Sequence, residues 1–524
     1  MKTMRTINTM TLAVAITLMV ALVMTLTLPM KVFAAGDWKL TISPPSSLSI
    51  EPGDFTLYKI FSVGGTAENP YYSTNDTATK AFVDWAKVQY GGYSPYGDSV
   101  ATLIEFLKGS PTPAQLKTLT NDIVKSGKFT PITNAKKEGD DDVSFMFLEN
   151  GYYLATGKGS PTAGGSKVSA YSSLVTINGK NVQINLKADV PEIGKTVSDE
   201  NLDPDSEDWG KELISNIGDT VYFKLDSYVP DMTGYDSYTF KIHDIMSKGL
   251  TFNASSVVVK LVDPEGKVSD ITLVKGTDFT VREDKIASGD SHIVIELENF
   301  IENKKYTGYS IVATYNAKLN QDAVSAPTSN PNDVYLEYSN NPYTFETGET
   351  PTDGVDIYTF DINIIKIDGD TKAVLKGAEF ELWAVSGDWT SAIKFSPYKE
   401  NDVVKAGEYV FDSTGGSTTL VSPVSGKIHI KGLLPGMYYL HETKAPEGYN
   451  KLPAETPIEI SYTTDGGTIV YPTAEITVEN NNGKELPGTG GIGTTIFYIV
   501  SAFLTAGLVI FFIVRKRMSI LNVK

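Results

Sequence analysis

Short segments in which apolar and polar side chains alternate recur through the middle and last third of this chain. In Thr220–Leu225, for example, every second residue is apolar, which is the pattern of a strand with one buried face. Turns rich in Gly and Pro separate these segments, and such spacing is typical of immunoglobulin-like β-sandwiches. The sequence therefore predicts a mainly β protein built from tandem β-sandwich domains.

The chain length sets the number of these domains. A chain of 524 residues is long enough for two to four domains, each with its own core. We expect three, at 35–190, 191–357 and 358–484, because Pro, Gly and Thr gather at Pro191 and over 347–354. These junctions are short, so the units should stack as a rod. The first unit also contains some helix, since apolar residues recur at helical spacing over 79–90, 99–107 and 113–126.

Composition excludes several classes of function. A formal net charge of -18 argues against binding nucleic acid or an anionic membrane surface through charge. There is no Cys, so disulfides, thiol nucleophiles and Cys-ligated zinc are excluded. The four His show no metal-ligand spacing, and the acidic turns at 140–142 and 368–370 are interpreted as solvated loops rather than calcium sites. No Gly-rich phosphate loop or nucleophile elbow occurs either, so we expect no cofactor, no metal and no enzyme that turns over a substrate.

The first 34 residues have the pattern of a secretory signal peptide. Lys2 and Arg5 precede an apolar run over 10–28, and small residues follow it, so cleavage is expected after Ala34. The alternative is a transmembrane anchor. The shortness of the run and the small residues at its end favour the signal peptide, and hence a secreted protein.

The last part of the chain, 485–524, contains a pentapeptide, an apolar span and a basic tail, in that order. An apolar span, Thr494–Val514, is long enough to cross a bilayer, and the basic tail Arg515–Arg517 would hold its end in the cytoplasm. A pentapeptide precedes them both: Leu486, Pro487, Gly488, Thr489 and Gly490. This arrangement resembles the cell-wall sorting signal of sortase substrates. The resemblance implies that a sortase cleaves after Thr489 and attaches the chain to peptidoglycan. The alternative is a single-pass membrane protein with a chance Pro-Gly turn.

The third unit contains the most specific internal motif, the segment Tyr438–Tyr449. It resembles the E-box of Gram-positive pilins and their Cna-B-like domains, and Phe360–Trp383 and Ile476–Asn480 resemble the first and last strands of the same family. The resemblance implies an intramolecular isopeptide bond between a first-strand Lys and a last-strand Asn, assisted by the E-box Glu. The matching residues are Lys366, Asn480 and Glu442.

Strand phase supports the same three residues independently. Lys366, Glu442 and Asn480 each share a strand face with the apolar residues two and four positions earlier, so all three should point into the core. Burial favours the neutral forms of an amine and a carboxyl. A neutral amine beside a protonated carboxyl could attack the Asn carboxamide and release ammonia. The alternatives are a buried salt bridge and a solvated strand face, and the E-box favours the bond.

The second unit offers a related set. Gly234–Phe240 and Ser247–Leu250 resemble the second domain of backbone pilins. The resemblance implies a Cna-A- or Cna-B-like domain, and related domains form the same bond with a Lys, an Asp and an Asn near the end of the domain. Each candidate is in phase with apolar neighbours: Lys195, Asp244 and Asn340, with Asn341 as the alternative to Asn340. The first unit has Thr156 where the third has Glu442, so no such bond is expected at that place.

The resemblance to backbone pilins also implies a lysine that joins subunits, on a strand just before the second domain. Here that strand is Val182–Lys187, which lacks the Tyr-Pro pair of the family, so Lys187 is assigned by position. The chain is thus interpreted as the shaft subunit of a sortase-assembled surface pilus that supports adhesion. Sortases, identical and minor pilins, peptidoglycan and a host surface or matrix are the implied partners. The alternative is a monomeric wall-anchored adhesin.

Overall fold

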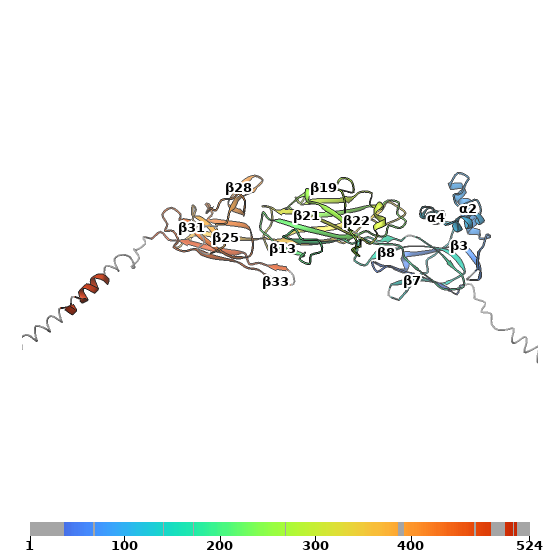
Figure 1. Ribbon diagram of the computed structural model, residues 1–524, viewed down its shortest axis with the longest axis horizontal. Coiled ribbons are helices and arrows are strands. Elements are labelled where there is room, and N and C mark those ends of the chain that lie inside the picture. The colour runs from blue at the N-terminus through green and yellow to red at the C-terminus, as the bar shows by residue number, and fades with distance from the viewer. Residues whose placement is uncertain are drawn as a thin grey trace, which may run out of the picture.

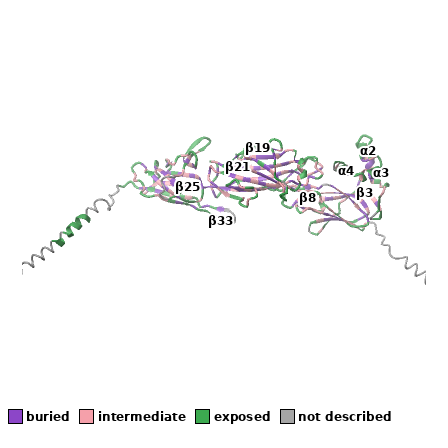
Figure 2. Cartoon of the chain, viewed as in Figure 1, coloured by how far each residue is buried: buried purple, intermediate pink, exposed green. Residues whose placement is uncertain are grey.

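Three β-rich units follow one another along an elongated rod (Figure 1). The computed structural model describes residues 36–66, 69–139, 141–170, 172–267, 269–385, 392–465, 468–483, 498–506 and 508–510. The first unit (blue) and the third unit (orange) lie at opposite ends of the rod, and the second (green) lies between them (Figure 1). Figure 2 shows buried residues along the strands of all three units.

The first unit packs two sheets face to face and adds three helices. One sheet has the order β11-β1-β7-β6 (Val182–Asn185, Trp38–Ser43, Asp142–Leu148, Lys136–Glu138). The other has the order β10-β8-β3-β4 (Ser173–Ile177, Gly151–Pro161, Phe55–Thr66, Asn69–Tyr72), with the short strands β2 (Leu48–Ser49), β5 (Pro131–Ile132) and β9 (Val168–Ser169) beside it.

The three helices coincide with those expected from apolar spacing: α2 (Thr77–Gln89), α3 (Val100–Lys108) and α4 (Pro113–Ser126). Ser99 and Thr112 begin the last two with reciprocal side-chain caps, which satisfy backbone N–H groups that have no partner within the helix.

The second unit is a larger sandwich. Its first sheet has the order β12-β14-β21-β17-β18 (Gly194–Ser198, Thr220–Tyr228, Ser310–Leu319, Val258–Val262, Ile271–Thr272), and β16 (Leu250–Phe252) also pairs with β21. Its second has the order β13-β24-β22-β15-β20-β19 (Glu212–Ile214, Asp353–Tyr358, Asn330–Ser339, Phe240–Met246, Ser291–Leu297, Phe279–Lys285), and β23 (Thr347–Glu349) pairs with β22.

The third unit packs two sheets against each other. One sheet has the order β27-β28-β30-β25-β35 (Phe395–Glu400, Val403–Phe411, Lys427–Leu433, Phe360–Asp368, Ala474–Asn480). The other has the order β29-β26-β31-β32 (Leu420–Val421, Glu379–Trp383, Gly436–Lys444, Thr456–Ile460). A separate hairpin joins β33 (Thr463–Asp465) to β34 (Thr468–Val470). The prediction of a mainly β chain of tandem modules, with helix in the first, is confirmed.

Buried contacts join the units end to end. Leu48 and Val168 of the first unit belong to the hydrophobic core of the second. At the next junction, Ile217 donates a backbone hydrogen bond to Gly432 of the third unit (3.2 Å). Gly432 has a φ of +92°, and a Cβ there would lie 2.6 Å from that of Ile217. The residue at this contact therefore has to be glycine.

The predicted span Thr494–Val514 lies mostly outside the described residues. Residues 498–506 and 508–510 are helical. Within the part of the chain that the structure describes, no helix is both long and apolar enough to cross a membrane.

Candidate cross-linking sites

The buried lysine of the third unit lies on its first strand, next to the last strand. Strand β25 pairs in parallel with β35, so that Lys366 is opposite Val478 and Asp368 is opposite Asn480. Lys366 is fully buried, and its Nζ donates to the carbonyl of Val478 at 2.9 Å. The amine is therefore held beside the backbone two residues before Asn480.

Glu442 reaches the same place from the facing sheet. Its Oε2 accepts hydrogen bonds from the Asn480 amide and from the backbone N–H of Leu452, both at 2.8 Å. The Asn480 amide also donates to the carbonyl of Asn450 at 2.5 Å. Within the described part of the chain, Glu442 Oε1 and Asn480 Oδ1 are buried and have no hydrogen-bond partner. No hydrogen bond among the described residues therefore offsets the burial of these two oxygens.

Electrostatics favour a reactive amine. Burial lowers the pKa of Lys366 to about 8, and the negative charge of Glu442 acts against this shift. A substantial fraction of the amine is then neutral near physiological pH, which a nucleophile requires. The structure brings all three predicted residues of this unit together.

A second buried lysine lies in the middle unit. Lys195 Nζ is 2.6 Å from Asp244 Oδ2, and both side chains have an exposed fraction of 0%. The amine lies over the rings of Phe223 and Tyr315, 5.4 and 5.7 Å from their centroids. Burial lowers the pKa of Lys195 to about 8, although Asp244 favours the charged form.

The amide of this second cluster comes from Asn332, which the sequence reasoning missed. Asn332 is fully buried and donates to the Tyr315 hydroxyl at 2.9 Å, and that hydroxyl donates to Asp244 Oδ2 at 2.5 Å. Lys195 and Tyr315 come from one sheet, whereas Asp244 and Asn332 come from the facing sheet. Asp244 Oδ1 and Asn332 Oδ1 are buried without a hydrogen-bond partner among the described residues. As in the third unit, a buried amine, carboxyl and amide come together, but here the amide comes from the same sheet as the carboxyl and not from that of the lysine.

Asn340, the residue predicted for this role, lies elsewhere. Asp244 is opposite Val334 on β22, and Asn340 is six positions further on, which is about 20 Å along an extended strand. Its amide donates to the carbonyl of Lys167 in the first unit at 3.1 Å. Asn341 donates to Glu346 at 2.9 Å. Both asparagines therefore belong to the junction between units, not to the Lys195 cluster.

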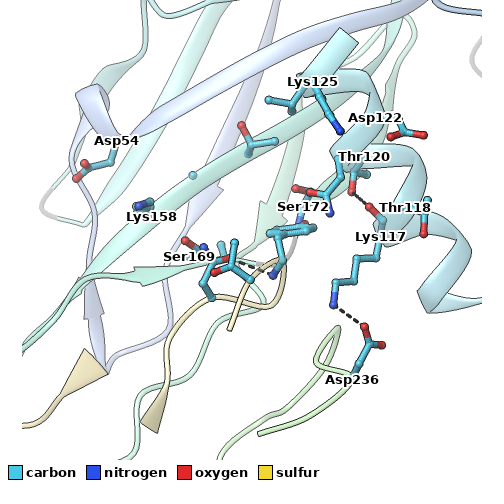
Figure 3. Close-up of a pocket in the computed structure, with 18 of the residues that line it drawn as sticks. Asp54, Lys117, Thr118, Thr120, Asp122, Lys125, Lys158, Ser169, Ser172 and Asp236 are labelled. Atoms are coloured by element: carbon cyan, nitrogen blue, oxygen red, sulfur yellow. Dashed lines mark hydrogen bonds and ion pairs between the residues drawn. The ribbon is translucent and has the colours of Figure 1, made fainter. Parts of the chain in front are cut away.

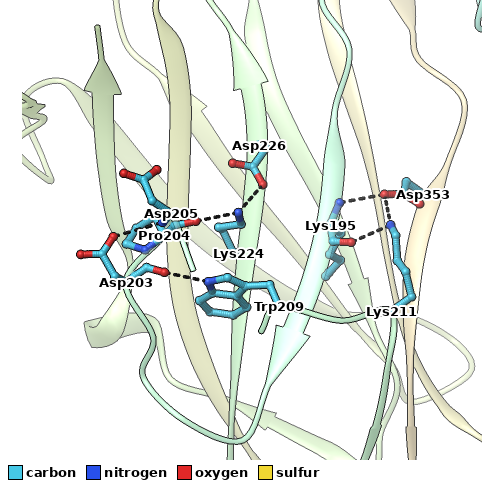
Figure 4. A network of polar contacts seen from close by, with 9 residues as sticks. All are labelled: Lys195, Asp203, Pro204, Asp205, Trp209, Lys211, Lys224, Asp226 and Asp353. Carbon is cyan, nitrogen blue, oxygen red and sulfur yellow. Dashed lines mark hydrogen bonds and ion pairs between the residues drawn. The ribbon is translucent and has the colours of Figure 1, made fainter. Parts of the chain in front are cut away.

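A polar network holds the strand that carries Lys195 (Figure 4). The backbone N–H of Lys195 donates to Asp353 at 2.7 Å, and Lys211 Nζ donates to the carbonyl of Lys195 at 2.6 Å. Lys211 also forms an ion pair with Asp353 at 2.6 Å. Because Asp353 begins β24, this network joins the first and last strands of the second unit and fixes the position of the lysine.

The residues that the sequence predicts to join subunits are described only in part. Lys187 is exposed and follows β11 at the end of the first unit that faces the second. Thr156 donates to the carbonyl of Thr56. The sorting pentapeptide, with Thr489, lies outside the described residues, as does the predicted signal peptide.

A pocket of about 880 Å³ lies between the first and second units (Figure 3). It is lined by α4, by β8 and by the loop 341–344 of the second unit. An ion pair between Lys117 on α4 and Asp236 of the second unit joins its two sides at 2.8 Å. Lys125 and Lys158 also line it. Lys187 is not one of the lining residues.

Comparison with known proteins assigns the second and third units to families. Residues 217–342 match the family described as Gram-positive pilin backbone subunit 2, Cna-B-like domain. Residues 360–483 match the SpaA prealbumin-like fold domain family.

Two relatives and one solved structure extend the comparison along the chain. The trypsin-resistant surface T6 protein of Streptococcus pyogenes serotype M6 is 24% identical and aligns over 82% of this chain and 92% of its own length. Fimbrial subunit type 1 of Actinomyces viscosus is 25% identical over 53% of this chain and 57% of its own length. The structure of the T6 backbone pilin of serotype M6 Streptococcus pyogenes, which has a modular three-domain structure, superposes with a TM-score of 0.50 at 18% identity. It covers 85% of this chain and 94% of that one.

Proposed function

Because this chain is a homologue of the Gram-positive backbone pilins, we propose that it is the shaft subunit of a covalent surface pilus, in which a sortase joins Thr489 of one subunit to Lys187 of the next. The homology supports a pilus subunit on the cell surface. The terminal subunit would be transferred to peptidoglycan, and the exposed shaft would support adhesion to a host surface or matrix.

The observation that carries this proposal is the position of Lys187. It is exposed and lies at the end of the first unit, whereas the sorting pentapeptide follows the third unit in the sequence, so the whole second and third units separate the two. A donor and an acceptor that are two units apart along the chain make a head-to-tail contact that repeats without closing, and such a contact produces a filament.

We expect Lys187→Ala to abolish the high-molecular-weight ladder that wild-type protein gives on denaturing gels of wall extracts, while wall attachment of the monomer continues. Lys158→Ala is the matched control, because Lys158 is an exposed lysine of the same unit that lines the pocket instead. A ladder that survives Lys187→Ala and is lost with Lys158→Ala would move the acceptor to the pocket. The absence of any wild-type ladder with its own sortase present would favour a monomeric wall-anchored adhesin.

The second part of the proposal is an isopeptide bond in the third unit. The neutral amine of Lys366 attacks Cγ of Asn480, an Nζ–Cγ amide bond forms, and the bond from Cγ to the original side-chain nitrogen breaks. Glu442, which is hydrogen-bonded to that nitrogen, accepts one proton from the Lys366 amine and delivers one to the nitrogen, which leaves as ammonia. The burial of Lys366, Glu442 and Asn480 and their hydrogen bonds support this reaction.

The same reaction is proposed for the second unit, with one revised residue. Lys195 is the nucleophile and Asp244 the proton carrier, and Asn332 replaces Asn340 as the acceptor because it is the buried amide linked to Asp244 through Tyr315. Each bond forms once per molecule without turnover, so neither unit is an enzyme. The bonds would stabilise an exported protein that has no disulfide.

A further inference from the structure

Strand β11 forms one edge of its sheet. In the order β11-β1-β7-β6 it pairs with β1 and with no other strand among the described residues. Leu186 donates its N–H to Ser43 of β1 at 2.8 Å, and alternate residues of a strand direct their N–H groups to the same side. The N–H groups of Gln183 and Asn185 therefore point away from β1. Both residues are exposed and pair with no further strand among the described residues, so this stretch of the edge can accept another strand.

The direction of β11 relates this edge to Lys187. The turn before β11 is at the far end of the first unit, because Asn178 donates to the carbonyl of Thr66, where β3 ends. The start of β3 is near the second unit, since Asp54 pairs with Lys167, whose carbonyl accepts from Asn340. Strand β11 thus runs from the free end of the rod toward the second unit, and Lys187 follows it.

The segment that follows the third unit is long enough to run along β11 of a neighbouring subunit. Strand β35 runs parallel to β25 away from the second unit and ends at Asn480, at the other pole of the rod. Thr489 is nine positions later, which corresponds to about 30 Å when extended. Along β11, the seven positions from Lys180 to Lys187 span about 23 Å. The segment is therefore long enough to run beside β11 when the third unit of one subunit abuts the first unit of the next, with little to spare.

We propose that residues 481–488 of one subunit add as a parallel strand to the β11 edge of the next subunit and so bring Thr489 to Lys187. This rests on the proposed function, because it needs Thr489 and Lys187 to be the joined residues. Pro487 has no N–H and must face away from the ladder. The N–H groups that face β11 then belong to Asn482, Lys484 and Leu486, which alternate with it.

A one-step linkage assay separates the two roles of the subunit. Full-length Lys187→Ala serves only as donor, and full-length Thr489→Ala serves only as acceptor, so sortase can join them into a single dimer. Edge changes are placed in the acceptor alone. Gln183→Pro with Asn185→Pro removes both outward N–H groups and keeps the pairing with β1, whereas Gln183→Ala with Asn185→Ala removes the same side chains and keeps the N–H groups.

We expect the proline acceptor to form dimer about tenfold more slowly than the alanine acceptor, since two hydrogen bonds of about 0.5–1.5 kcal/mol each are lost. Equal rates for the two acceptors, with normal dimer formation when the acceptor has no edge change, would contradict the added strand but not the proposed function. If the unaltered pair gives no dimer, the Thr489–Lys187 linkage itself is wrong.

Hydrogen exchange gives a second test, which does not use the proline or alanine changes at the edge. In the purified dimer of the unaltered pair, the amides of Gln183 and Asn185 in the acceptor should exchange more slowly than in the free acceptor, because they become hydrogen-bonded. Unchanged exchange at both amides would contradict the proposal.

Discussion

Loss of the cross-link in the third unit should have a large and calculable effect on stability. Lys366 and Asn480 are 114 positions apart, and closing a loop of that length removes about 5 kcal/mol of chain entropy, in free-energy terms, from the unfolded state. For a unit of this size, that corresponds to roughly 20 °C in the unfolding midpoint. Glu442→Ala should therefore give the full mass of its own sequence, without the loss of one ammonia, and lower the midpoint of this unit by about that amount.

The change also removes hydrogen bonds, and a second variant separates the two effects. Glu442→Ala leaves the Leu452 N–H and the Asn480 amide without this acceptor, at a cost of about 1–3 kcal/mol for each group. Lys366→Met keeps Glu442 and its hydrogen bonds but cannot form the bond. If loss of the cross-link accounts for most of the effect, each single variant should lose a similar amount of unfolding free energy. The double variant should then lose much less than the sum of the two single losses.

The assay combines intact mass, tryptic peptide mapping and calorimetry of the full chain. Wild-type protein should yield one branched peptide that contains Lys366 and Asn480. Separate, unmodified peptides for both residues in wild type would refute the reasoning. So would a Lys366→Met chain that unfolds at the wild-type temperature, because the stabilisation would then not come from the bond.

Two further predictions concern the amide of the second unit and the pH response. Asn332→Ala should leave the Lys195 peptide unbranched, whereas Asn340→Ala should leave the branched peptide in place; peptide mapping of both variants would show the reverse if Asn340 were the partner. In Asn480→Ala the Lys366 amine stays free, with a folded pKa of about 8 against 10.5 in the unfolded chain, so the unfolded state binds more protons between these values. The free energy of unfolding should then rise from about pH 8 to 10.5 and be flat below pH 8, and chemical denaturation at several pH values would detect a wrong sign.

The third unit could be predicted closely because its signals are local. The E-box places Glu442 on a recognisable strand, and Lys366 and Asn480 lie on the first and last strands of the unit. In a sandwich whose first and last strands pair in parallel, these positions leave little choice of partner. The helices of the first unit were also evident from apolar spacing, and the structure adds the caps at Ser99 and Thr112.

The second unit shows where such reasoning stops. Asn332, Leu336 and Tyr338 share one phase of β22, and Asn340, one residue past its end, continues that phase in the sequence. A period of two residues reports which face a side chain occupies, not its level along the strand. Only the register of β22 against β15, which places Val334 opposite Asp244, selects Asn332. Tyr315 joins the cluster from the other sheet, and no local pattern indicates that contact.

The sequence by itself determined the mainly β modules and the buried faces that carry Lys195, Asp244, Lys366 and Glu442, because side-chain alternation and short motifs are properties of neighbouring residues. The tertiary structure decided which buried amide meets which lysine and which strand edge beside Lys187 is open. Those features depend on strand register and on the packing of one sheet against another, and both are set by contacts between residues far apart in the chain.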